Sequence, residues 1–74
     1  MLLAKAAEKL LPQEVEDIGV LFEVGEIAVG LEHLCIQLVE HEQQLSGEEQ
    51  LELLRLANAV NLSRLYWEPL MGSN

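Results

Sequence analysis

Apolar residues at helical spacing, separated by strong helix-stop signals, constrain the fold of this chain most. In the longest periodic segment, Glu26 to about Gln44, large aliphatic residues recur at intervals of three and four, which places them on one side of an α-helix: Ile27, Leu31, Leu34 and Leu38. Ala28 and Cys35 widen this stripe. No segment alternates apolar and polar residues as a strand does. The sequence therefore predicts an all-α protein.

Two helices are expected before this segment. Leu2 to Leu11 is rich in Leu, Ala, Lys and Glu, all good helix formers, and it stops before Pro12, which disfavours helical geometry in the preceding residue. The next helix begins near Gln13 with acidic residues in its first turn, and Gly25 is its expected C-terminal stop.

Capping signals also mark the second half of the chain. Ser46 followed by Glu49 has the capping-box pattern, so a helix is expected from there to Asn61, a residue that tolerates left-handed backbone. Ser63 is expected to cap a short last turn. Trp67, in that turn, is expected to close one end of the core.

Short connections between amphipathic helices favour antiparallel neighbours. We therefore expect a small antiparallel four-helix bundle with a short C-terminal helical turn. The 74 residues allow one domain, over residues 1–74, close to the lower size limit for an unaided core. Because only Phe22, Tyr66 and Trp67 are aromatic, that core should be aliphatic.

The chain is strongly acidic, with thirteen Asp and Glu against four Lys and Arg and a formal net charge of −9. Like charge at this density destabilises a small domain through self-repulsion, so the surface suggests a positively charged partner. It also argues against direct binding of nucleic acid.

Cysteine usage and hydropathy indicate the compartment. Cys35 is the only cysteine, which excludes an intramolecular disulfide and fits a reducing environment. Charged residues stand in the first nine positions, where a signal peptide needs its apolar segment, and no later stretch is apolar enough to span a membrane. We therefore expect a cytoplasmic protein.

The positions of the His, Cys, Ser and acidic residues do not favour a catalytic or metal-binding site. His33, Cys35 and His41 are close in sequence, but their helical positions diverge and Cys35 points toward the buried stripe. The carboxylates lie on helix faces that water should reach rather than in a cleft. None of the serines has the Asp-Ser-Leu type of setting that a phosphopantetheine carrier protein needs. We expect no catalytic residue, metal site or cofactor.

A binding surface is the remaining interpretation. Val29 and Ile36 lie on nearly the same side of the long helix, roughly opposite the Leu31 stripe, within an acidic frame. The alternative is that these two residues pack under the first helix or are ordinary exposed aliphatics. Acidic residues of the preceding helix could extend the same surface. The expected partner-binding residues are Asp17, Glu23, Glu26, Val29, Glu32, His33, Ile36 and Glu40.

Several segments resemble the MafI-like immunity proteins of bacterial polymorphic toxin and contact-dependent growth inhibition systems. These are Gly25-Glu26, Gly30-Leu31-Glu32-His33-Leu34-Cys35 and Leu38-Val39-Glu40, then Leu56-Ala57-Asn58-Ala59-Val60-Asn61-Leu62 and the pair Tyr66-Trp67. The resemblance covers about Val15 to Leu70. It departs at Gly30, where alanine is usual in the family; this glycine could permit close approach of another helix or of the partner.

The resemblance implies a cytosolic antidote that binds the C-terminal toxin domain of a cognate effector, commonly a nuclease. The acidic residues would then meet the cationic groove in which the toxin holds nucleic-acid phosphates. Two alternatives stay open: an adaptor or regulatory subunit without a toxin partner, and a homodimer through leftover apolar positions such as Val20, Val24 and Leu56.

Overall fold

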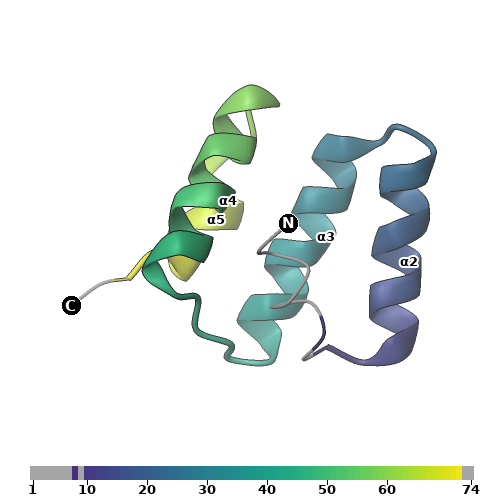
Figure 1. Ribbon diagram of the computed structural model, residues 1–74, viewed down its shortest axis with the longest axis horizontal. Coiled ribbons are helices and arrows are strands. Elements are labelled where there is room, and N and C mark those ends of the chain that lie inside the picture. The colour runs from purple at the N-terminus through teal and green to yellow at the C-terminus, as the bar shows by residue number, and fades with distance from the viewer. Residues whose placement is uncertain (1–7, 9, 73–74) are drawn as a thin grey trace.

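The computed structural model describes residues 8 and 10–72, and within them the chain is helical and free of β-strands (Figure 1). The elements are α2 (Pro12–Glu23), α3 (Ile27–Glu40), α4 (Gly47–Ala59), the single turn α5 (Arg64–Trp67) and the 3-10 helix η1 (Glu68–Leu70). The all-α prediction is confirmed. Most of the helix expected over Leu2–Leu11 lies outside the described residues, while Glu8, Leu10 and Leu11 are described and are not helical.

The three longer helices end in the same way, on a residue with left-handed backbone. Gly25 has φ 84°, Glu42 has φ 53° and Asn61 has φ 55°. At each end two backbone N–H groups turn back onto the last carbonyls; after α3, for example, Gln43 N–H donates to the Leu38 oxygen at 2.9 Å. This pairing is the Schellman motif, which satisfies carbonyls that a helix end would leave bare.

The end of α3 differs from the expectation. The periodic pattern predicted a helix from Glu26 to about Gln44, whereas α3 ends at Glu40 and Glu26 is its N-cap. The cause is the left-handed turn at Glu42, which redirects the chain. Glutamate is an uncommon residue for that conformation, so the stop carries no sequence signal.

The predicted helix starts are confirmed for α4 and α5. Ser46 Oγ accepts a hydrogen bond from Glu49 N–H at 3.1 Å, and Glu49 Oε1 accepts one from Ser46 N–H at 2.8 Å, which completes the capping box. Ser63 Oγ accepts from Leu65 N–H at 3.3 Å. These bonds satisfy N–H groups that have no carbonyl partner inside their helices.

Leucine dominates the core, as expected. Its buried members come from α2, α3, α4, η1 and the connecting segments, and none from α5: Leu10, Ile18, Leu31, Leu34, Cys35, Leu38, Leu45, Leu53, Ala57, Leu62 and Leu70. Ile27 of the predicted stripe is not buried, because it stands at the start of α3, and Leu51 points outward from α4. Trp67 packs against this core, and its Nε1 donates to the Leu62 carbonyl at 3.3 Å.

Helices α2 and α3 form a hairpin around the turn at Gly25, and they lie side by side in Figure 1. Gly30, buried in α3, brings the two helices together: a Cβ at this position would lie 2.8 Å from Cε1 of Phe22 in α2. The missing side chain therefore allows the aromatic ring to rest on the α3 backbone. On the other side of α3, α5 and η1 pack against it, and α5 also contacts α4.

Candidate functional site

The outer side of α3 carries five of the eight expected partner-binding residues. The inner side is filled by Gly30, Leu31, Leu34, Cys35 and Leu38. At about 100° per residue, the opposite side presents a set that we call the acidic face: Val29, Glu32, His33, Ile36 and Glu40. Of these, Val29 and Glu32 are half-buried and the other three are exposed.

One row of the acidic face alternates acid and aliphatic side chains. Glu32, Ile36 and Glu40 follow each other at intervals of four residues, so they are neighbours along one ridge of the helix. Each carboxylate is thus one turn away from the exposed Ile36. This geometry places an apolar contact between two negative charges.

The remaining three expected residues lie beside or beyond this ridge. Glu23 is the last residue of α2 and Glu26 the N-cap of α3, so both flank the turn at Gly25 and both are exposed. Asp17 lies farther back on α2, where its Oδ1 accepts a hydrogen bond from Gln13 Nε2 at 3.0 Å. The hairpin therefore brings Glu23 and Glu26 close together, whereas Asp17 stands more than one helical turn before Glu23.

The acidic residues expected to bind the partner have no neutralising ion pair within residues 8 and 10–72. Arg64 pairs with Glu68 on its own short helix, and that pair is exposed. The negative potential of the acidic face is consequently open to an incoming cation.

A shallow apolar groove adjoins the acidic face, between α3 and α5. Its volume is about 190 Å³, and its lining consists of Cys35, Ile36, Val39, Glu40, Leu65, Tyr66 and Pro69. The side chains of Ile36, Val39 and Leu65 are 43%, 42% and 86% exposed. Two expected residues, Ile36 and Glu40, thus meet residues that sequence reasoning missed. Leu65, two residues before Trp67 in α5, projects into water.

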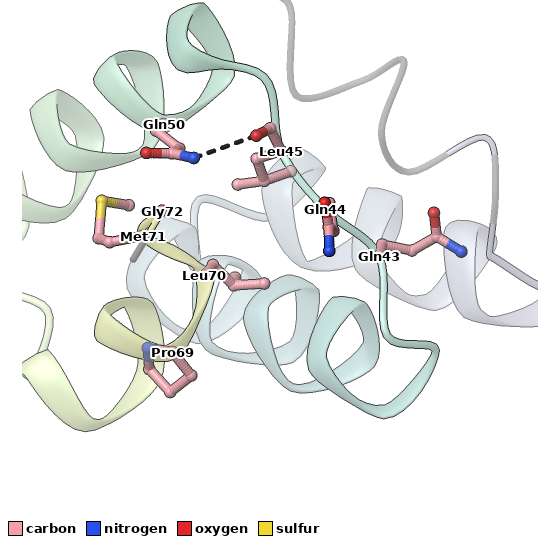
Figure 2. A pocket seen from close by; sticks show the side chains of 8 residues that line it. All are labelled: Gln43, Gln44, Leu45, Gln50, Pro69, Leu70, Met71 and Gly72. Atoms are coloured by element: carbon pink, nitrogen blue, oxygen red, sulfur yellow. Dashed lines mark hydrogen bonds between the residues drawn. The ribbon is translucent and has the colours of Figure 1, made fainter. Parts of the chain in front are cut away.

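A second hollow of about 320 Å³ lies between the segment that follows α3 and the end of η1 (Figure 2). Its lining holds amides and aliphatic groups but no ionisable side chain: Gln43, Gln44, Leu45, Gln50, Pro69, Leu70, Met71 and Gly72. The Gln50 amide is engaged, since its Nε2 donates to the Leu45 carbonyl at 3.1 Å. This hollow offers no group for acid–base or nucleophilic chemistry.

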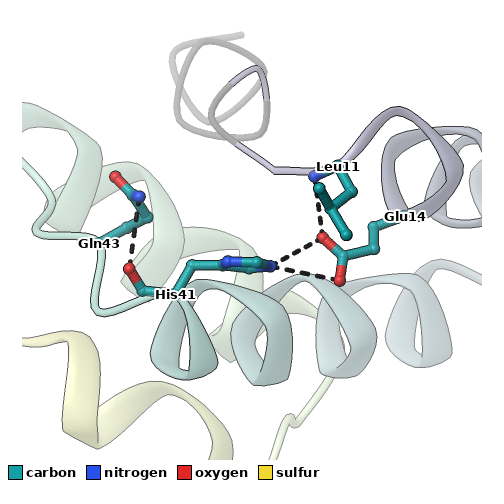
Figure 3. A network of polar contacts seen from close by, with 4 residues as sticks. All are labelled: Leu11, Glu14, His41 and Gln43. Atoms are coloured by element: carbon teal, nitrogen blue, oxygen red, sulfur yellow. Dashed lines mark hydrogen bonds and ion pairs between the residues drawn. The ribbon is translucent and has the colours of Figure 1, made fainter.

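Cys35 and His41 are engaged within the fold, whereas His33 is exposed on α3. Cys35 is fully buried, and desolvation raises the pKa of its thiol to about 12, so it does not form a thiolate near neutral pH. His41 Nε2 lies 3.0 Å from Oε1 of Glu14 and 3.3 Å from its Oε2, and Glu14 also accepts from Leu11 N–H at 2.9 Å (Figure 3). The pair ties the end of α3 to the start of α2.

No cluster of three or more His, Cys, Asp or Glu side chains suited to a metal ion occurs in residues 8 and 10–72. Within the same residues, no helix combines the length and the apolar character needed to cross a bilayer.

Comparisons with protein-family models, with curated proteins and with solved structures found no significant match to this chain.

Proposed function

We propose that this chain is a cytoplasmic immunity protein that binds and neutralises the C-terminal toxin domain of a cognate contact-dependent inhibition or related polymorphic toxin, commonly a nuclease. The acidic face carries this proposal. Glu32 and Glu40 lie one turn before and one turn after the exposed Ile36, and neither has an ion-pair partner among the described residues of this chain, whose net charge is −9. A basic protein that binds nucleic acid is complementary to such a surface.

The proposed mechanism needs no catalysis by this chain. Carboxylates of the acidic face enter the cationic groove where the toxin holds phosphates, and they exclude the nucleic acid by occupying the same Lys and Arg side chains. In this proposal the helices form an antiparallel bundle, and the hairpin of α2 and α3 supports that arrangement. The bundle keeps the acidic side chains in a fixed row.

Co-expression with the toxin domain of the same locus tests the proposal. The expected result is that cells survive and that a stable complex co-purifies. Death of the cells together with the absence of a complex would refute the immunity function.

Charge reversal locates the interface. The double variant Glu32→Lys, Glu40→Lys should slow association with the toxin domain by about tenfold or more, because steering by opposite charge is lost. A matched control, Glu16→Lys with Glu48→Lys, makes the same change in net charge, from −9 to −5, at exposed acids outside the acidic face. An equal loss in both variants would mean that only the overall charge matters.

A second candidate function is an adaptor or regulatory subunit whose partner is not basic. The observation in its favour is the apolar groove, which could bind a neutral helix by hydrophobic contact alone. Salt separates the two candidates: affinity for a basic toxin should fall steeply between low and physiological ionic strength, whereas a neutral partner should bind almost equally at both.

Self-association is the remaining alternative, and it is favoured by exposed Val20 in α2 and Val24 at the C-cap of that helix. Both lie one helical turn apart on the surface of a strongly charged chain. Sedimentation equilibrium at low and high salt measures it directly. Dimers that are abolished by Val24→Gln would establish α2 as a homodimer interface.

A further inference from the structure

Several aliphatic side chains are exposed to water in the groove between α3 and α5. Ile36 and Val39 approach it from α3, and Leu65 approaches it from α5. Single exposed aliphatic side chains are common on proteins, whereas adjoining ones that form a contiguous patch are a feature of interaction sites. Leu65, at 86% exposure, contributes almost nothing to the core of this fold.

The size of the groove limits what can occupy it. Sites for small molecules and cofactors commonly enclose about 300–1,000 Å³, and this groove measures about 190 Å³. Its only ionisable groups are the Glu40 carboxylate, the Tyr66 hydroxyl and the buried thiol of Cys35. A single aliphatic or aromatic side chain of a protein partner suits this volume and chemistry better than a polar metabolite.

Charge selects among protein partners. Glu40 lines the groove and Glu32 precedes Ile36 by one turn, and neither has an ion-pair partner among the described residues. A second copy of the chain, docked through the same surface, would bring the same carboxylates against one another. A segment that carries Lys or Arg beside its apolar anchor pairs with them instead.

The spacing of the two acids suits a helix. Glu32 and Glu40 are separated by eight residues, or about 12 Å along the axis of α3 at 1.5 Å per residue. A partner helix with one basic residue a turn before its apolar anchor and another a turn after it spans the same distance. Helices that present such a face commonly dock in apolar grooves.

We propose that the groove between α3 and α5 binds one large apolar side chain of a basic amphipathic helix, whose flanking Lys or Arg residues pair with Glu32 and Glu40. This assignment rests on the proposed function in so far as the helix belongs to the toxin. It adds the apolar anchor to an interface otherwise described by charge alone.

The first test uses a defined probe instead of the natural partner. A synthetic helical peptide of Leu and Lys only, about 18 residues long, with Leu at helical spacing, is titrated into the ¹⁵N-labelled full chain. We expect the largest chemical-shift changes at Ile36, Val39 and Leu65. An identical peptide with Glu in place of Lys should leave the spectrum unchanged. Changes centred on α2 or α4 would overturn the assignment.

Matched variants separate the anchor from non-specific attraction to an acidic protein. Leu65→Gln removes the apolar contact without altering net charge, and Leu51→Gln, at a position 61% exposed on α4, is the control. Leu65→Gln should weaken binding of the Lys peptide by about tenfold, as expected for the loss of a central anchor. Leu51→Gln should change it little, and thermal melts of both variants should match the parent. Equal affinity of the Leu65→Gln and parent chains would refute the groove.

The same variants distinguish this assignment from the immunity function. If the toxin domain is neutralised and Leu65→Gln binds it as tightly as the parent, the function stands and the groove is wrong. If the toxin domain does not bind but the Lys peptide occupies the groove, the groove stands and the immunity function is wrong. Dimers of the free chain that bury Val39 and Leu65 would also overturn the assignment, because the groove would then serve self-association.

Discussion

Gly30 and Phe22 are in direct contact across the hairpin of α2 and α3, with the Phe22 ring lying where a Cβ of residue 30 would be. The added Cβ would be 2.8 Å from Cε1 and 2.9 Å from Cδ1, well inside normal contact distance. Glycine in the middle of a helix costs about 1 kcal/mol relative to alanine. The close approach of the ring offsets that cost and explains the glycine at this position.

Gly30→Ala should therefore lower the free energy of unfolding by about 1–2 kcal/mol, since overpacking outweighs the gain in helix propensity. Urea denaturation measures this directly. In a Phe22→Leu background the ring is gone, and the same substitution should become stabilising by up to about 1 kcal/mol. If Gly30→Ala still lowers the free energy of unfolding in that background, the Phe22 ring is not what disfavours a side chain at residue 30.

The contact of His41 with Glu14 should stabilise the hairpin by about 1 kcal/mol, because both side chains are mostly shielded from water. A double-mutant cycle with His41→Ala and Glu14→Ala measures this coupling. The exposed pair of Arg64 and Glu68 serves as comparison and should give no more than about 0.5 kcal/mol. Equal coupling free energies for the two pairs would contradict the idea that partial burial strengthens the contact of His41 with Glu14.

Ser46→Ala should cost about 1 kcal/mol of stability, since it removes the acceptor for the N–H of Glu49 at the start of α4. Glu49→Ala removes the reciprocal bond to Ser46 N–H. It should cost somewhat less, because this exposed N–H group can donate a hydrogen bond to water instead. Thermal denaturation of the two single variants and the double variant checks both values. Additive losses would show that the two bonds of the capping box act independently.

Much of this fold could be predicted from local signals. The stripe of Leu31, Leu34 and Leu38 is buried as its period of three and four residues requires, and the stops at Gly25 and Asn61 occur where residues tolerant of left-handed backbone stand. In each of these cases a property of the residue itself, apolar character or tolerance of left-handed backbone, causes the observed structure. The sequence pattern and the structure therefore agree.

Two features could not be predicted because their causes are not local. The stop after α3 uses Glu42, whose side chain gives no hint of the left-handed backbone, φ 53°, that it adopts. The groove forms because the single turn of α5 leaves Leu65 outside the core and beside α3. The sequence could place Glu32, Glu40 and Ile36 on one helix. Leu65 joins them only through tertiary packing, and so does the groove in which it lies beside Val39.

Glu42→Gly should raise the free energy of unfolding by about 0.5–1 kcal/mol. It relieves a left-handed conformation that costs other L-residues about 1–2 kcal/mol, and this gain exceeds the roughly 0.4–1 kcal/mol of extra entropy in the unfolded chain. Glu42→Gln removes the same charge without favouring the left-handed backbone, so it is the control for electrostatic repulsion. Asn61→Gly should change stability little, because asparagine already tolerates this backbone. A gain at Asn61 as large as that at Glu42 would contradict this explanation.

The burial of Cys35 predicts a specific loss of stability in alkali. Desolvation raises the pKa of its thiol from 9.0 to about 12. Between these values the unfolded chain gives up the thiol proton while the folded chain keeps it, so the folded state binds more protons and the free energy of unfolding falls as pH rises. The contribution is complete below pH 9 and is lost toward pH 12.

Cys35→Ala lacks this titration but shares every other ionisable group, so the two chains differ only through the thiol and the small cavity left by the sulfur. Urea denaturation at several pH values between about 8 and 10.5 should show the stability advantage of the parent chain shrinking as pH increases. A constant difference would mean that the thiol ionises equally in both states. Labelling by a thiol reagent near pH 8 provides an independent check: the native chain should react far more slowly than the urea-unfolded chain, because only transient opening exposes the sulfur.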